Sequence, residues 1–141
     1  MLSVADLTGA WRLTSHYFLG AEGSTSEGPL GAGAAGLLVY DADGYISVGL
    51  MRTVGGPHQA AGPAAFYMGY SGRWRLAGGM LVHEVEISSH PHIVDTTQVR
   101  EAHLDDDELI LRERLDETPR YFVLRWRRAG RNQDPDPPGS C

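Results

Sequence analysis

Apolar and polar residues alternate one by one along several stretches of this chain. Every second residue from Tyr70 to Leu76 is apolar or glycine, and the residues between them are serine or arginine. A period of two places successive side chains on opposite faces of a strand, so this stretch predicts a half-buried strand. Gly78 and Gly79 favour a turn, and the alternation resumes from Leu81 to Ser88. The two stretches together predict an antiparallel hairpin.

The same pattern predicts two further hairpins and two more strands. One hairpin joins residues 36–40 to residues 44–51 through Asp43-Gly44, a dipeptide typical of tight turns. The other joins residues 109–112 to residues 122–127. Strands over residues 11–19 and 96–104 bring the total to about eight antiparallel strands in chain order.

About eight strands in this order favour an all-β fold. Closing an eight-stranded antiparallel sheet into an up-and-down barrel removes its edges and leaves an interior that fits side chains or one small ligand. A β-sandwich is the alternative. The only helix that the pattern predicts is short, around Pro63–Met68. In the barrel we expect Trp11 to close one end by packing near Arg125 or Arg127 of the last strand.

Three segments interrupt the alternation. Residues 20–36 and 55–63 are rich in glycine and small residues, and they are long for simple turns, so we expect lids or lips of the barrel. Residues 129–141 hold three prolines among polar residues, which predicts a disordered tail. The sequence therefore predicts one domain over residues 1–128, followed by that tail.

Composition excludes several classes of function. The net charge of −6 gives no electrostatic attraction to nucleic acid. All twelve basic residues are arginines, so Schiff-base chemistry and the lysine of a phosphate-binding loop are absent. Cys141 is the single cysteine, which excludes an intrachain disulfide. Without an apolar membrane span or a signal-peptide pattern, we expect a cytoplasmic protein with no membrane partner.

Several short motifs resemble those of bacterial lipocalin-like domains. The first strand opens with a Gly-x-Trp motif, and the last one closes with an arginine-rich motif that contains tryptophan. The other matching motifs follow in the expected order and cover most of residues 7–128. The motifs are Gly9-Ala10-Trp11-Arg12-Leu13, Gly36-Leu37-Leu38-Val39-Tyr40, Asp43-Gly44-Tyr45, Tyr70-Ser71-Gly72, Thr97-Gln98-Val99-Arg100 and Leu124-Arg125-Trp126-Arg127-Arg128.

This resemblance implies a calycin-type barrel with a central cavity for a small apolar ligand. Some bacterial relatives of such barrels are biosynthetic enzymes that rearrange a bound product, and others have no known activity. The chain lacks the signal peptide and the disulfide cysteines of secreted lipocalins. That difference argues against an extracellular carrier.

His83 is the first candidate for chemistry inside the barrel. It alternates with Leu81 and Val85, so on an inward face its imidazole is desolvated and serves as a neutral base or donor. A core histidine satisfied by a neighbour is the alternative. Tyr70 shares a face with Trp74 and is the candidate for a hydroxyl that donates to a ligand carbonyl.

Arg100 is the second candidate. It shares a face with Gln98 and Leu104, and a buried guanidinium needs an anionic partner. Glu113 is inward by the same parity, so an Arg100–Glu113 pair is one hypothesis. Recognition of a carboxylate, enolate or carbonyl of a substrate by Arg100 and Gln98 is the other.

The predicted site combines these polar residues with an apolar wall. We expect His83, Arg100 and Tyr70 to act in catalysis and the other residues to contact the substrate. The substrate-binding set is Gln98, Tyr17, Glu113, Trp74, Leu81, Val85, Phe122 and Leu124, and Leu13, Leu38 and Leu111 extend the wall.

We expect neither a metal nor a cofactor. His90 and His92 have a spacing that metal ligands use, but Pro91 between them favours a loop at the barrel mouth. The glycines form no dinucleotide-binding fingerprint, and the acidic run 105–108 suits a solvated turn.

Two hypotheses for function follow. The first is a cofactor-free cyclase, isomerase or eliminating lyase of secondary metabolism, which encloses an apolar, oxygenated molecule and acts by positioning and acid–base help. The second is a non-catalytic carrier of a hydrophobic metabolite. Either would work as a monomer or a homodimer.

Overall fold

The structure is a closed antiparallel β-barrel in which consecutive strands pair from the third to the ninth. The computed structural model describes residues 2–30, 33–52, 66–115 and 120–130. Its strands are β1 (Gly9–Leu19), β2 (Thr25–Glu27), β3 (Ala35–Tyr40), β4 (Tyr45–Met51), β5 (Tyr67–Ala77), β6 (Met80–Ser88), β7 (Thr97–Asp105), β8 (Glu108–Arg114) and β9 (Tyr121–Arg128). The short helix α1 (Val4–Leu7) precedes β1, and a 3₁₀ turn, η1 (Pro91–Ile93), lies between β6 and β7.

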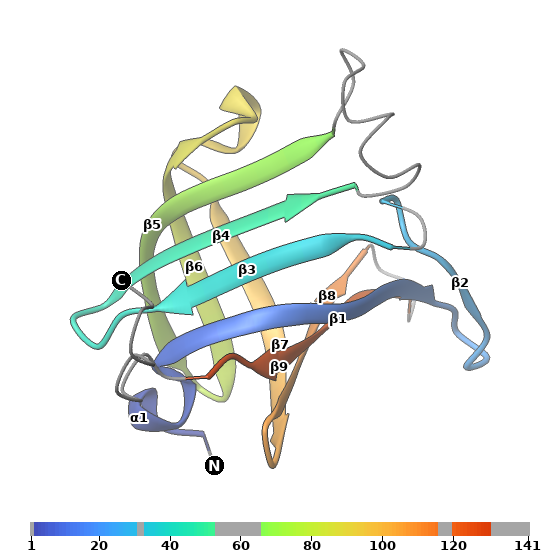
Figure 1. The fold of residues 1–141 in the computed structure, drawn as a ribbon, viewed down its shortest axis with the longest axis horizontal. Coiled ribbons are helices and arrows are strands. Elements are labelled where there is room, and N and C mark those ends of the chain that lie inside the picture. The colour runs from blue at the N-terminus through green and yellow to red at the C-terminus, as the bar shows by residue number, and fades with distance from the viewer. Residues whose placement is uncertain (1, 31–32, 53–65, 116–119, 131–141) are drawn as a thin grey trace, which may run out of the picture.

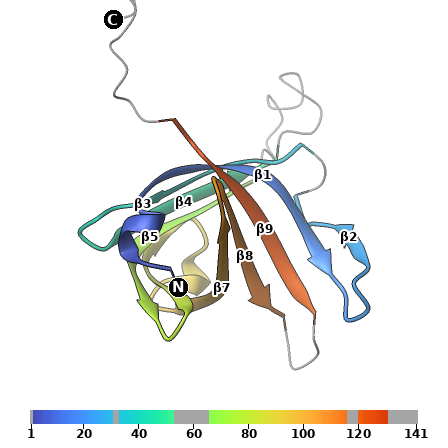
Figure 2. The same ribbon diagram turned by 90° about the horizontal axis from the view of Figure 1, so that it is seen from below.

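Pairing between the first and last strands closes the barrel. β1 runs antiparallel to β9 from Trp11, opposite Arg128, to Leu19, opposite Tyr121. The first half of β1 also pairs with β3, and its second half pairs with β2. Figure 2 shows β9 lying beside β1. The predicted eight-stranded barrel is therefore confirmed, with β2 as a short addition, and the sandwich alternative is wrong.

The three predicted hairpins are confirmed by their strand pairing, although the turn between β8 and β9 includes residues 116–119, which lie outside the described residues. The other turns use residues that tolerate positive φ. Gly44 (φ 98°) ends the β3–β4 turn, in which its N–H donates to the Asp41 carbonyl. Gly78 and Gly79 turn β5 into β6 with φ values of 58° and 83°. Asp106 (φ 54°) occupies the same region of conformational space in the acidic turn before β8.

The predicted short helix is wrong where the structure describes it. Tyr67 and Met68 belong to β5, and the rest of the segment except Phe66 lies outside the described residues. Two helical turns were not predicted, α1 and η1. Ser3 caps α1 in a capping box with Asp6, which stabilises a helix of only four residues.

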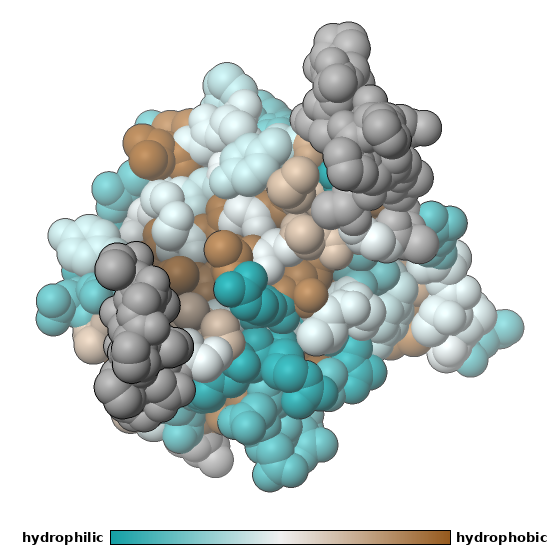
Figure 3. Space-filling view, viewed as in Figure 1, coloured by the Kyte–Doolittle hydropathy of each residue, from teal (hydrophilic) through white to brown (hydrophobic). Residues whose placement is uncertain are grey.

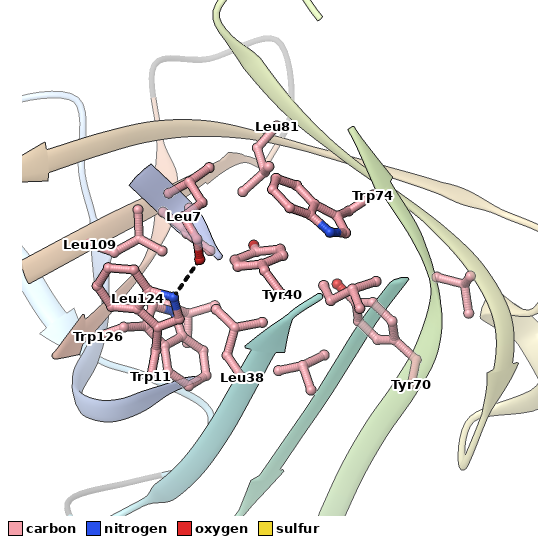
Figure 4. Packing of buried hydrophobic residues seen from close by; sticks show 14 residues of the cluster. Leu7, Trp11, Leu38, Tyr40, Tyr70, Trp74, Leu81, Leu109, Leu124 and Trp126 are labelled. Carbon is pink, nitrogen blue, oxygen red and sulfur yellow. Dashed lines mark hydrogen bonds between the residues drawn. The ribbon is translucent and has the colours of Figure 1, made fainter. Parts of the chain in front are cut away.

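Helix α1 and large side chains fill one end of the barrel. Leu7 is fully buried, and its carbonyl accepts a hydrogen bond from the Trp11 indole (3.0 Å), as Figure 4 shows. The buried cluster around them consists of Leu38, Tyr40, Ile46, Val48, Tyr70, Trp74, Leu81, Val85, Leu109, Leu111, Leu124 and Trp126. We call this filled region the closed end, and the end where β2 lies the open end (Figure 1).

Arg128 fastens the closed end. Its guanidinium lies 4.1 Å from the Trp11 ring and donates to the carbonyls of Asp6 (2.7 Å) and Thr8 (3.2 Å). The expected packing of Trp11 near Arg125 or Arg127 is therefore wrong by one position, because those two side chains alternate outward on β9. Ala129, assigned to the tail from sequence, still donates to the Ala10 carbonyl. Residues 131–141 of the predicted tail lie outside the described residues.

Two one-residue bulges change which side chains face inward. In β1 the register shifts between Leu13 and Ser15. In the β5–β6 pair it shifts between Ser71 and Gly72, so that Gly72 pairs with Val85 and Ser71 with Ile87. Beyond each bulge the alternation is inverted relative to the sequence pattern. Ile87, expected inside with Val85, is 66% exposed as a result.

The bulge in β6 requires a glycine on β5. A Cβ on Gly72 would overlap the Glu84 carbonyl oxygen, which is backbone and has little freedom to move. We expect Gly72→Ala to lower the free energy of unfolding by about 3 kcal/mol, measured by urea denaturation.

Gly49→Ala is the matched control, because it also lies inside a strand. The nearest atom to its added Cβ is the Tyr67 hydroxyl, at the end of a side chain that can swing toward solvent. Gly49→Ala should therefore lower the free energy of unfolding by clearly less than Gly72→Ala does. Equal losses in the two variants would contradict a close backbone approach at the bulge.

Candidate functional site

His83 lies between two tyrosine hydroxyls in the middle of the barrel. Its Nε2 is 2.7 Å from the Tyr40 hydroxyl, and its Nδ1 is 2.6 Å from the Tyr70 hydroxyl. Strands β3, β5 and β6 each place one of the three side chains there by inward alternation. All three are almost completely buried, His83 with 2% of its surface exposed. The expected inward face of His83 and Tyr70 is confirmed.

Proton counting leaves this group one spare donor. A neutral imidazole has one N–H and one acceptor nitrogen, so it accepts from one tyrosine and donates to the other. Three protons therefore serve two hydrogen bonds, and the hydroxyl that accepts from His83 keeps its own proton for a third partner. Tyr70 (7% exposed) is the more accessible of the two hydroxyl-bearing residues.

Burial keeps the whole group uncharged near neutral pH. Desolvation, aided by the nearby Arg100 guanidinium, lowers the pKa of His83 from 6.5 to about 3. Desolvation also raises the pKa of Tyr70 to about 12 and that of Tyr40 well above its usual value. His83 is therefore a neutral hydrogen-bonding group, and protonating it is costly.

Arg100 supplies the positive charge next to this group. Its side chain is 11% exposed and lies 3.4 Å from a carboxylate oxygen of Glu113 on β8. It also donates to its neighbour's carbonyl, that of Val99 (3.1 Å), and to the Gln98 side-chain oxygen at the long distance of 3.5 Å. The predicted Arg100–Glu113 pair is thus present, with Gln98 on the same inward face.

These six residues form a ring of polar groups around the barrel interior. Tyr40, Tyr70, His83, Gln98, Arg100 and Glu113 come from five strands, β3 and β5 to β8, and we call them the polar belt. Arg100 acts electrostatically on His83, Tyr40 and Tyr70 across the interior. The belt therefore works as one electrostatic unit rather than as separate side chains.

The predicted apolar wall divides between the two ends of the barrel. Trp74, Leu81, Val85 and Leu124 belong to the buried cluster, and the Trp74 indole donates to the Asp41 carbonyl (2.9 Å). Phe122 packs at the margin of that cluster. It is one of several inward apolar side chains toward the open end that stay only partly buried, together with Leu13, Leu50 and Met68.

Tyr17 does not face the interior. The bulge in β1 reverses the alternation, so Tyr17 pairs with Val123 on the outer face, while His16 and Phe18 point inward toward Phe122. On that outer face Arg125 donates hydrogen bonds to the Glu108 carboxylate and to the Tyr17 hydroxyl, and these bonds raise the pKa of Arg125. The expectation that Tyr17 shares the cavity with Trp11 is therefore wrong.

Residues 28–30 cross near the open end as a strap. The Leu30 N–H donates to His16 Nε2 (3.1 Å), and the His16 ring occupies the space that a Cβ on Gly28 would need. Arg52, just after β4, donates to the Pro29 carbonyl (3.3 Å). This strap lies within the segment expected to form a lid or lip, whereas the other such segment, 55–63, lies outside the described residues.

His90 and His92 occupy η1 and its N-terminal flank, with ring centroids 5.9 Å apart. Within the described residues, no group of three or more histidine, cysteine, aspartate or glutamate side chains could hold a metal ion. No helix of the described chain is long and apolar enough to cross a membrane.

Sequence reasoning missed two residues of the interior, Tyr40 and His16. Tyr40 shares its inward parity with Leu38, which could have placed it inside, but its partner His83 is 43 residues away. His16 lies beyond the β1 bulge, and no local signal in the sequence marks that bulge.

A family model described as a lipocalin-like domain matches residues 8–129. The solved structures that resemble the chain include the wild-type fluorescent protein UnaG, at 16% identity and a TM-score of 0.46, covering 90% of this chain and all of that one. A mutant of UnaG matches at 18% identity and a TM-score of 0.44, covering 92% of this chain and all of that one. The comparison with curated proteins found no match.

The buried neutral state of His83 predicts a specific loss of stability in acid. The pKa of His83 is about 3 in the folded chain and 6.5 in the unfolded chain. Between these two pH values the imidazole is protonated in the unfolded chain and neutral in the folded one. The stabilisation is complete above pH 6.5 and falls by about 1.4 kcal/mol per pH unit as the pH drops toward 3. Urea denaturation at a series of pH values should show His83→Gln with a flatter pH dependence than the wild type.

His92→Gln, at an exposed position of η1, is the matched control and should keep the wild-type slope. Other acid-titrating groups are common to all three proteins, so they cancel in the comparison. Equal slopes for the wild type and His83→Gln would contradict a neutral buried imidazole.

Proposed function

The chain belongs to the lipocalin-like domain family, and from this premise we propose that it binds a hydrophobic small molecule with an anionic or carbonyl oxygen at one end. The ligand would lie in the open half of the barrel. Its polar end would meet the polar belt, and its apolar body would extend toward the strap. A lipocalin-like barrel is suited to enclosing one such molecule.

The single observation that carries this proposal is the uneven burial of the inner face. The large inward side chains at the closed end are mostly buried, with Leu76 and Leu104 as partly buried exceptions. Toward the open end Leu13, Leu50, Met68 and Phe122 all keep part of their surface exposed. These four come from β9, β1, β4 and β5, so they line one side of the interior. Exposed apolar surface that faces inward is costly in water and gains free energy when a hydrophobic ligand covers it.

The polar belt supports an oxygen at the inner end of the ligand. A guanidinium has five N–H donors, and the Glu113 contact of Arg100 is single and fairly long, at 3.4 Å. A ligand carboxylate could therefore join or replace Glu113 on Arg100. The spare hydroxyl proton of the tyrosine–histidine group offers a second donor.

Catalysis of a cofactor-free cyclisation or isomerisation is the second candidate. It is favoured by the hydroxyl–imidazole–hydroxyl chain, because such a chain can relay a proton to a carbonyl held near Arg100. The same geometry argues for binding instead, because both nitrogens of His83 are already occupied. Binding is accordingly our principal proposal, and Arg100, Tyr70 and His83 would be the catalytic residues of the alternative.

Replacing Arg100 tests the polar end of the site. A fatty acid that carries a dansyl group is a suitable probe, with its fluorescence as the readout. We expect Arg100→Met to weaken binding of the acid by about tenfold, roughly 1.4 kcal/mol, and to leave binding of its methyl ester nearly unchanged. Removing a guanidinium that pairs with a carboxylate affects only the charged probe.

Arg112→Met is the matched control. Arg112 lies on the next strand and forms an ion pair with Glu101 (2.6 Å) on the outward side of the barrel. The Arg112→Met variant should bind the acid and its methyl ester as the wild type does. Unchanged affinity for the acid in Arg100→Met would overturn the assignment of the polar end.

Ligand carried through native purification distinguishes the two candidates. Mass spectrometry of the intact complex should find a bound molecule of unchanged mass if the protein is a binder. Converted product, formed at a rate that falls in Tyr70→Phe, would favour catalysis instead.

A further inference from the structure

Large apolar side chains gather on the outside of the barrel, over β3, β4, β5 and the end of β6. Figure 3 shows hydrophobic residues at the centre of this side of the molecule, with hydrophilic residues around them. We call this region the outer apolar face. Its large residues are Leu37 (48% exposed), Val39 (42%), Tyr45 (51%), Met51 (39%), Tyr67 (55%) and Ile87 (66%).

Two adjoining grooves cross the outer apolar face. The first has a volume of about 440 Å³ and lies among Leu37, Met51 and Tyr67. The second has a volume of about 350 Å³ and lies between Tyr45 and Ile87. Val39 and Ser47, near the middle of the face, line both grooves, so the second groove continues the first across the strands.

The two grooves differ in charge. Arg12 on β1 lines the first groove, and Asp41 and Glu86 line the second. All three residues are exposed. Beside the second groove, the Arg73 guanidinium is stacked on the Tyr45 ring, 4.5 Å from the ring centroid. Arg12 thus lines one groove, and two carboxylates line the other, with Arg73 beside them.

We propose that this face binds a second copy of the chain through a twofold axis near Ser47. Away from its axis, a twofold rotation brings each residue of a face opposite a different residue of its partner, and every such contact occurs twice. The basic groove of one protomer then meets the acidic groove of the other. Arg12 of each protomer then faces Glu86 of the other, while Leu37 and Ile87 cover each other's grooves.

The bulge in β6 is what exposes Ile87 for this contact. Without the register shift, Ile87 would alternate inward with Val85 and the second groove would lose its apolar wall. Apolar patches of this kind on monomers measure about 300–600 Å², below the roughly 800 Å² per partner of a standard interface. The dimer is therefore reversible and forms at micromolar or higher concentration.

Sedimentation velocity over a range from low to high micromolar concentration tests the proposal. The wild type should shift from monomer toward dimer as concentration rises. Val39→Glu should raise the dimer dissociation constant by about tenfold or more, because it buries a charge at the centre of the interface. Val99→Glu is the matched control, since Val99 on β7 is equally exposed (45%) but lies outside this face, and it should dimerise like the wild type.

Charge reversal tests the reciprocity of the contact. Arg12→Glu and Glu86→Arg should each weaken the dimer when studied alone, because like charges then meet in both contacts. An equimolar mixture of these two variants should associate again, since the carboxylate introduced in one protomer then faces the guanidinium introduced in the other. The double variant should also recover. Recovery on mixing requires position 12 of one protomer to lie against position 86 of the other.

A wild type that remains monomeric at high micromolar concentration would overturn the proposal. So would a dimer that is unaffected by Val39→Glu and by both charge reversals, because it would use another surface. Retention of the monomer on phosphatidylcholine vesicles, lost in Val39→Glu, would assign the face to a lipid surface instead.

Discussion

A buried guanidinium needs compensating charge and hydrogen-bond acceptors, and the middle of this barrel is organised around that of Arg100. Glu113 supplies the opposite charge, and Gln98 and a backbone carbonyl supply acceptors. Burial, aided by this positive charge, lowers the pKa of His83, so the imidazole is neutral and can bridge two tyrosine hydroxyls. Removing this one charge would leave Glu113 without the guanidinium that it faces.

The alternation of residues was sufficient to predict the barrel and most of its inner face. The period of two survives in β5, β7, β8 and β9, and there Tyr70, Trp74, Arg100 and Glu113 lie on the expected side. The predictions are wrong for Tyr17 and Ile87, each of which follows a bulge. One inserted residue inverts every later side chain of a strand, and nothing in the local composition marks the insertion.

The sequence pattern could not predict contacts between distant segments of the chain. The strap contacts β1 through one backbone N–H and the His16 ring, and that ring faces inward only because of the β1 bulge. From its sequence pattern Tyr40 is an ordinary core residue, and only the structure shows that His83 on β6 lies beside its hydroxyl. Such pairings depend on how the sheet curves, and a linear period carries no information about curvature.

Closure of the barrel through β1 and β9 also bears on how the chain is made. The hydroxyl of Thr14 donates to the Arg125 carbonyl across 111 positions of sequence, and β9 is the last strand of the described chain. During synthesis, β1 therefore waits for nearly the whole domain to emerge from the ribosome before it gains this neighbour. Until then the nascent sheet has two free edges and an uncovered apolar face, the conditions under which chains pair with one another and aggregate. Chaperone dependence and slow final folding are the expected cost of placing the closing strand at the end.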